Sequence, residues 1–95
     1  MPEVEISRAD VEQFLSRFSV VVRDGDRETR HAVTMSRGDF ERLGRSYRTP
    51  EEFVRACFAF LLARESNEQI LASFDVSQIA TYFPEFEEII GNPPA

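Results

Sequence analysis

The widest apolar surface of this chain falls on residues 50–65, where the hydrophobic positions follow a helical period. Thr49 can cap the first turn, Pro50 suits the first helical position, and Glu52 completes a capping box. The apolar positions are Phe53, Val54, Cys57, Phe58, Phe60, Leu61 and Leu62. A helix that is apolar over most of its circumference is usually buried between neighbours. We therefore predict a central, mostly buried helix, with a dimer interface as the alternative use of one face.

A second helical period lies near the N-terminus and predicts a helix over residues 8–18. Ser7 can cap this helix, and four apolar residues share an arc of about 100° on its wheel. Those four residues are Val11, Phe14, Leu15 and Phe18. The expected helix is amphipathic, with one face on the core and the other in solvent.

Strand-like alternation follows over residues 19–35 and predicts an antiparallel hairpin. Asp24 and Gly25 lie between two β-rich runs, and this dipeptide favours a tight turn because Gly accepts a positive φ. In the second run, His31, Val33 and Met35 alternate with polar or small residues. We expect one face of this hairpin to pack on the core.

Three further helices are predicted, over residues 37–43, 67–74 and 76–90, with a frayed tail at 91–95. Their starts are marked by capping residues and their apolar positions recur at helical spacing. The expected fold is α+β, a mainly helical single domain of residues 1–95 with one antiparallel β-hairpin. A chain of this length is long enough for one core of its own.

The charge of the chain is −6 and is unevenly distributed, since residues 1–48 hold 9 Arg and 9 Asp or Glu. From Glu65 onward there are 6 acidic residues and no basic one. This acidic segment disfavours contact with nucleic acid or an anionic membrane, and we expect a solvated, solubilising surface, with attraction of a basic partner as the alternative. The central apolar segment is shorter than the roughly 20 residues that span a bilayer, so no membrane segment is expected. One cysteine and the lack of a secretory signal predict a cytoplasmic protein.

The candidate chemistry is sparse, and we expect no catalytic, cofactor-binding or metal-binding residues. His31 is the one histidine and lies in a strand, where a structural role is expected. Cys57 lies among aromatic residues, where burial raises the pKa of a thiol and makes it inert. The acids around the predicted turn at Asp24 lack the spacing of a calcium loop, and the scattered glycines match no phosphate-binding pattern. The chain is therefore predicted not to be an enzyme.

The order of a strand, a short helix and a longer helix over about residues 29–65 resembles a ribbon-helix-helix DNA-binding domain. In that family a strand from each protomer pairs across a dimer and enters the major groove. The resemblance implies that Arg30, Thr34 and Arg37 contact nucleic acid, since Arg can bind guanine edges and phosphates. Against it stand the acidic net charge and a preceding strand that already pairs one edge of this ribbon.

A second resemblance covers about residues 20–86 and is to a family of small bacterial proteins with no activity that can be carried over. The residues that carry it are Asp24-Gly25, Val33-Thr34, Pro50–Phe53, Phe60–Glu65 and the Phe74–Glu85 block. It implies a compact bacterial domain.

The function predicted from these patterns is a non-enzymatic interaction or regulatory module with an unidentified protein partner or a second copy of itself. We expect Tyr82, Phe83 and Phe86 to contact that partner, because aromatic residues near acids are common at interfaces. The alternative use of these three residues is core filling.

Overall fold

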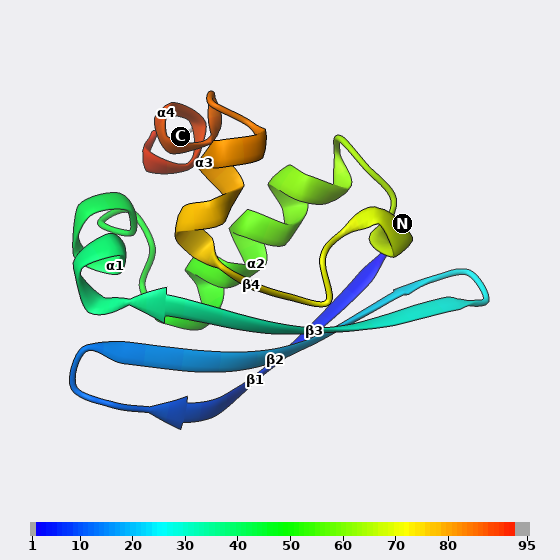
Figure 1. Cartoon of the computed structure of the whole chain (residues 1–95), viewed down its shortest axis with the longest axis horizontal. Coiled ribbons are helices and arrows are strands. Elements are labelled where there is room, and N and C mark those ends of the chain that lie inside the picture. The colour runs from blue at the N-terminus through cyan, green and yellow to red at the C-terminus, as the bar shows by residue number, and fades with distance from the viewer. Residues whose placement is uncertain (1, 93–95) are drawn as a thin grey trace.

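The computed structural model describes residues 2–92 and consists of one mixed sheet with helices packed against one of its faces (Figure 1). The sheet has 4 strands, and their order in space is their order in the chain. The strands are β1 (Glu3–Val11), β2 (Leu15–Asp24), β3 (Arg27–Ser36) and β4 (Ser73–Asp75). The first three pair antiparallel, and β4 runs parallel to β3. The prediction of a mainly helical domain with one hairpin is therefore wrong, and the protein is an α+β domain built on a larger sheet.

The predicted helix over residues 8–18 does not form, because this stretch belongs to β1, β2 and their connection. Val4 and Ile6 alternate along β1 and pack against the core, a strand pattern that the sequence analysis missed. Val11 and Phe14, expected on the buried face of the helix, are 55% and 66% exposed. Pairing with β2 gives the backbone of this segment more hydrogen-bond partners than a short isolated helix would. The strand therefore forms although the apolar residues recur at a helical spacing.

The predicted β-hairpin is present and longer than expected, with Asp24 paired to Arg27 across the turn. Gly25 takes a φ of +65°, the left-handed conformation that the Asp-Gly turn requires. Phe18, Val20 and Val22 of β2 point to the helix-covered face and are buried. The hairpin is thus the centre of the sheet rather than an appendage of a helical body.

Two helices follow the pattern read from the sequence. Helix α1 (Arg37–Leu43) has the predicted bounds and is capped by the Ser36 hydroxyl. Helix α2 (Pro50–Leu62) begins where predicted, with the Thr49 hydroxyl accepting from the N–H of Glu52 at 3.1 Å, and ends three residues early. Its buried residues are Phe53, Val54, Cys57, Phe58, Phe60 and Leu61. The prediction of a buried central helix is confirmed, since α2 lies across the sheet.

The segment after α2 is more broken than predicted. The expected helix over 67–74 is replaced by a 3-10 turn and a strand, and the expected helix over 76–90 is interrupted around Pro84. The elements are η1 (Asn67–Gln69), β4, η2 (Val76–Gln78), α3 (Ile79–Tyr82) and α4 (Phe86–Gly91). β4 forms because the free edge of β3 accepts it, from Ala32 to Thr34. Of the predicted tail, Gly91 ends α4, and residues 93–95 lie outside the described part of the chain.

Two buried polar side chains hold this broken segment against the hairpin. The amide nitrogen of Asn67 donates to the carbonyl oxygens of Val22 at 3.4 Å and Arg27 at 3.3 Å. The His31 ring donates from Nδ1 to the Leu71 carbonyl at 2.7 Å, because a carbonyl can only accept, and its Nε2 is hydrogen-bonded to the Thr29 hydroxyl at 2.8 Å. The structural role predicted for His31 is confirmed. These contacts fix η1 and the residues before β4 at one side of α2.

Candidate functional site: the Glu65 groove

A groove of about 390 Å³ lies between the C-terminal end of α2 and the segment that runs from η1 to α3. Its apolar lining is Leu61, Ile70, Leu71, Phe74, Ile79, Tyr82 and Phe83. Its polar lining is Glu65, Gln69 and Gln78. We call this cavity the Glu65 groove. Its volume is within the range of about 300–1,000 Å³ that is usual for ligand-binding clefts.

Glu65 is the charged residue of this groove, and its environment is unfavourable for a carboxylate. Burial against the apolar lining raises the pKa of Glu65 above its ordinary value. No Arg among the described residues lies within ion-pair distance of it. The neighbouring Arg64 turns elsewhere, over the Phe60 ring at 3.6 Å and toward Glu85 at 3.5 Å. The groove therefore holds a half-buried carboxylate without a cation.

The two glutamines of the groove are fixed by the capping boxes of the 3-10 turns. Oε1 of Gln69 accepts from the N–H of Ser66 at 2.9 Å, and Oε1 of Gln78 accepts from the N–H of Asp75 at 2.8 Å. Because a backbone N–H can only donate, these contacts also establish which end of each amide is the oxygen. Neither Nε2 has a hydrogen-bond partner within residues 2–92. The groove is thus lined by two side-chain amides whose oxygens are fixed and whose N–H groups have no partner among the described residues.

Of the three aromatic residues predicted to contact a partner, two line the groove and one does not. Tyr82 is 63% exposed at the rim, and Phe83 is half-buried with its ring edge-on to Phe60. Phe86 is 1% exposed and packs on Phe60 from the other side, with ring centroids 5.1 Å apart. Phe86 fills the core, so its prediction as a surface contact is wrong.

The charged and polar groove residues Glu65, Gln69 and Gln78, and the exposed Leu71, were missed as candidates by sequence reasoning. Leu71 is 46% exposed at the rim, held there by the bond from His31 to its carbonyl. No local signal in the sequence distinguishes Glu65 from the other acids of the segment without bases. Only the structure shows that Glu68, Glu85 and Glu87 pair with arginines while, within residues 2–92, Glu65 does not.

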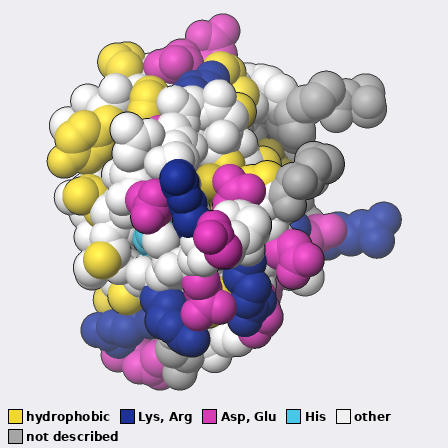
Figure 2. Space-filling model, turned by 90° about the vertical axis from the view of Figure 1, so that its right-hand side faces the viewer, with side chains coloured by type: hydrophobic (Ala, Val, Ile, Leu, Met, Phe, Trp, Pro, Cys, Tyr) yellow, Lys and Arg dark blue, Asp and Glu magenta, His cyan; other side chains and the backbone are white. Residues whose placement is uncertain are grey.

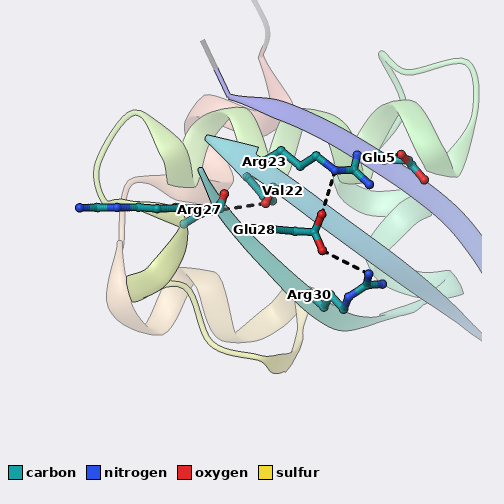
Figure 3. Close-up of polar contacts among 7 residues, drawn as sticks. Glu5, Val22, Arg23, Arg27, Glu28 and Arg30 are labelled. Atoms are coloured by element: carbon teal, nitrogen blue, oxygen red, sulfur yellow. Dashed lines mark hydrogen bonds and ion pairs between the residues drawn. The ribbon is translucent and has the colours of Figure 1, made fainter. Parts of the chain in front are cut away.

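The sheet face that carries no helix has a different character, because its charged side chains pair with one another (Figure 3). Glu5 pairs with Arg23 at 3.0 Å, Arg23 with Glu28 at 2.9 Å, and Glu28 with Arg30 at 3.2 Å. We call these four residues the ion-pair chain. Figure 2 shows the molecule from the right-hand side of Figure 1. Basic and acidic side chains are interleaved over the lower half of this view, and hydrophobic side chains gather along its left edge.

The residues proposed for nucleic-acid contact lie on or beside this outer sheet face. Arg30 belongs to the ion-pair chain, Arg37 pairs with Glu41 at 3.2 Å, and Thr34 donates to Asp75 at 2.6 Å. β3 is paired on both sides, with β2 along its length and with β4 at Ala32–Thr34. β4 thus occupies part of the β3 edge that a second protomer would need in a ribbon-helix-helix dimer, and nucleic-acid contact by these three residues stays a prediction.

The remaining candidates of the sequence analysis offer no reactive centre. Cys57 is buried, and desolvation raises the pKa of its thiol as predicted. Within residues 2–92 no group of three His, Cys, Asp or Glu side chains is arranged to hold a metal ion. Whether the protein is an enzyme is not decided by these contacts, and its assignment as a non-enzyme stays a prediction.

A second hollow of about 420 Å³ lies between β1 and α2. Its lining is Pro2, Val4, Arg55, Ala59, Leu62 and Ala63. Its one charged group is already engaged, because Arg55 donates to the Val4 carbonyl at 2.7 Å. This hollow therefore offers one polar side chain, part of which is engaged by the backbone, whereas the Glu65 groove combines a carboxylate with two amides, so the Glu65 groove is the stronger candidate.

Within the described part of the chain, each helix is too short or too polar to cross a lipid bilayer. Comparison of the chain with models of protein families, with curated proteins and with solved structures finds no match. The case for a function consequently depends on the geometry of the groove.

Proposed function

We propose that this protein is a non-enzymatic interaction or regulatory module that binds a protein partner through the Glu65 groove. The observation that carries the proposal is the position of Glu65, a half-buried carboxylate that lines a largely apolar groove and has no cation within ion-pair distance among the described residues. Such an arrangement costs stability in the free protein, because burial disfavours the charged form. Costs of this kind are typical of functional surfaces, where stability is exchanged for recognition.

The rim of the groove supports a macromolecular partner. Tyr82 and Leu71, which both line the groove, have large apolar side chains that are 63% and 46% exposed. Tyrosine is enriched among the residues that dominate interface energies, since it combines a large apolar area with a polar tip. Phe83 extends the same surface toward the interior. A partner that covers the rim would bury these side chains together with Glu65.

Two expectations from the sequence accompany this proposal. We propose that the protein acts in the cytoplasm of a bacterium, on the basis of its cysteine content and its resemblance to small bacterial proteins. A second copy of the chain is one candidate partner, and sedimentation equilibrium at micromolar concentration distinguishes a homodimer from a monomer that awaits another protein.

The test of the proposal is a capture experiment with matched surface variants. Full-length wild type, Tyr82→Ser, Leu71→Ser and the control Ile89→Ser are immobilised and exposed to lysate of the native cell. Ile89 is 44% exposed but does not line the groove, so it controls for the loss of surface hydrophobicity. We expect one specific protein to be retained by wild type and Ile89→Ser and lost from both groove variants. The purified partner should then bind the groove variants at least about tenfold more weakly. Equal capture by all four proteins would refute the proposal.

A further inference from the structure

We infer that the segment bound in the Glu65 groove is a peptide stretch of apolar residues that carries one Lys or Arg, whose cation pairs with Glu65. The inference rests on the function proposed above and specifies the chemistry of the partner. Its basis is charge complementarity together with the two free amide donors of the groove.

The charge argument starts from the acids that follow α2. Most of them are engaged within the protein: Glu68 pairs with Arg27 at 3.1 Å, Glu85 with Arg64 at 3.5 Å and Glu87 with Arg42 at 2.9 Å. Asp75 accepts from Thr34. Glu65 is the acid that lies inside the groove, and it lacks such a partner within the described residues. A cation from a bound segment would complete the pairing, and the surplus of negative charge in this region would attract it.

The donors of the groove select a peptide over a simple hydrocarbon. The free Nε2 groups of Gln69 and Gln78 are held in place because their Oε1 atoms are engaged in the capping boxes. Positioned N–H donors complement carbonyl oxygens, which every peptide segment supplies from its backbone. A ligand with apolar side chains, carbonyl oxygens and one cation satisfies the lining, the amides and Glu65 together.

The experiment is selection from a random 12-residue peptide library displayed on phage, with the full-length protein as bait. Recovered sequences are synthesised, and their affinities are measured by calorimetry against wild type, Tyr82→Ser, Glu65→Gln and the control Glu68→Gln. Glu68 has the same chemistry three residues away but pairs with Arg27 and does not line the groove. We expect the peptides to share one Lys or Arg among apolar residues and to lose about tenfold or more in affinity with Glu65→Gln but not with Glu68→Gln. Replacing the basic residue of the peptide by norleucine should cause the same loss in wild type and no further loss in Glu65→Gln.

The failure of this inference is distinguishable from the failure of the proposed function. One outcome is that the peptides depend on Tyr82 for binding but keep their affinity with Glu65→Gln and with norleucine. Such peptides would refute the pairing of a cation with Glu65 and would still support partner binding at the Glu65 groove. If no peptide from the library binds in a Tyr82-dependent way, both the pairing of a cation with Glu65 and the proposed binding function of the groove are refuted. Thermal unfolding of each variant shows that it is folded, and Glu65→Gln should unfold at the wild-type temperature or slightly above it, since the substitution removes a desolvated charge.

Discussion

The outer face of the sheet and the Glu65 groove both carry charged residues, but the charges on the sheet face are paired with one another and, among the described residues, the charge in the groove is not. On the sheet face, the ion-pair chain matches two acids with two arginines in contacts of 2.9–3.2 Å, all well exposed to solvent. In the groove, a single carboxylate lies among apolar side chains, and burial raises its pKa. The first region has more charge, whereas the second has charge that the protein itself does not neutralise.

This difference explains why the arginine-rich half of the chain suggests an anion-binding surface in the sequence, whereas in the structure its arginines on the sheet face are already paired with acids. A paired, solvated cation gains little from a new anionic ligand, because it must first give up contacts of similar strength. A half-buried carboxylate without a cation gains from any ligand that supplies one. The unpaired group, and not the density of charge, therefore marks the surface available for binding.

The largest expected effect separates the rim of the groove from the core beneath it. Phe86→Ala should reduce the free energy of unfolding by about 3–5 kcal/mol, because the 1% exposed ring leaves a cavity beside Phe60. Tyr82→Ala should change it by no more than about 0.5 kcal/mol, since its 63% exposed ring supports little of the core. Urea denaturation followed by circular dichroism measures both values. A cost for Tyr82→Ala equal to that of Phe86→Ala would show that the rim is part of the core and would remove it as a contact surface.

How far the sequence predicts this fold depends on whether a segment is stabilised locally or by distant partners. Helix α2 has its own caps and its own apolar period, so its start and its buried face could be read directly. The Asp-Gly turn at Gly25 is a similarly local signal. β1 is different, because the alternation of Val4 and Ile6 is a short strand signal and the placement of β1 depends on its pairing with β2.

The same distinction applies to the groove. Tyr82 and Phe83 could be selected as aromatic residues near acids, but nothing in the local pattern separates them from Phe86, which packs on Phe60. Glu65 could not be singled out among the acids, because its lack of a partner becomes apparent only once Arg27, Arg42 and Arg64 have paired elsewhere. Contacts between residues far apart in the chain decide both points.

The next largest effect is expected in the pH dependence of stability, where Asp75, whose carboxylate is hydrogen-bonded, is compared with Glu65, which has no cation partner among the described residues. Burial alone would raise the pKa of Asp75, but hydrogen bonds from Thr34 and Ser77 outweigh it and lower that pKa below its ordinary value of 3.8. The folded state therefore binds a proton less readily than the unfolded state. The stability that the Asp75 carboxylate contributes is present above about pH 3.8 and lost as the pH falls through the folded-state pKa. Asp75→Asn should cost about 1 kcal/mol at pH 7, and the difference from wild type should shrink in acid.

Glu65→Gln should show the reverse pH dependence. Because the folded-state pKa of Glu65 is raised, the charged carboxylate penalises folding as the pH rises above its ordinary value of 4.5, and no penalty remains below that value. The substitution should leave the Tm unchanged near pH 3 and leave it unchanged or raise it slightly at pH 7. Thermal melts of wild type and both variants between pH 3 and pH 7 decide the matter. Parallel pH curves for Asp75→Asn and Glu65→Gln would contradict the assignment of one acid as paired and the other as unpaired.

The smallest effect is expected on the sheet face, where Arg23 lies at the centre of the ion-pair chain. Hydrogen bonds from Arg23 to Glu5 and Glu28 raise its pKa, but all three side chains remain exposed to solvent. Arg23→Gln should therefore shift the Tm by less than about 3 °C, and the shift should vanish in 0.5 M NaCl because salt screens exposed pairs. Partner and peptide binding at the Glu65 groove should be unchanged by this substitution. A large loss of stability that persists in high salt would show that the outer face contributes to the fold as strongly as the groove side does, and the contrast between a self-neutralised surface and an open one would no longer hold.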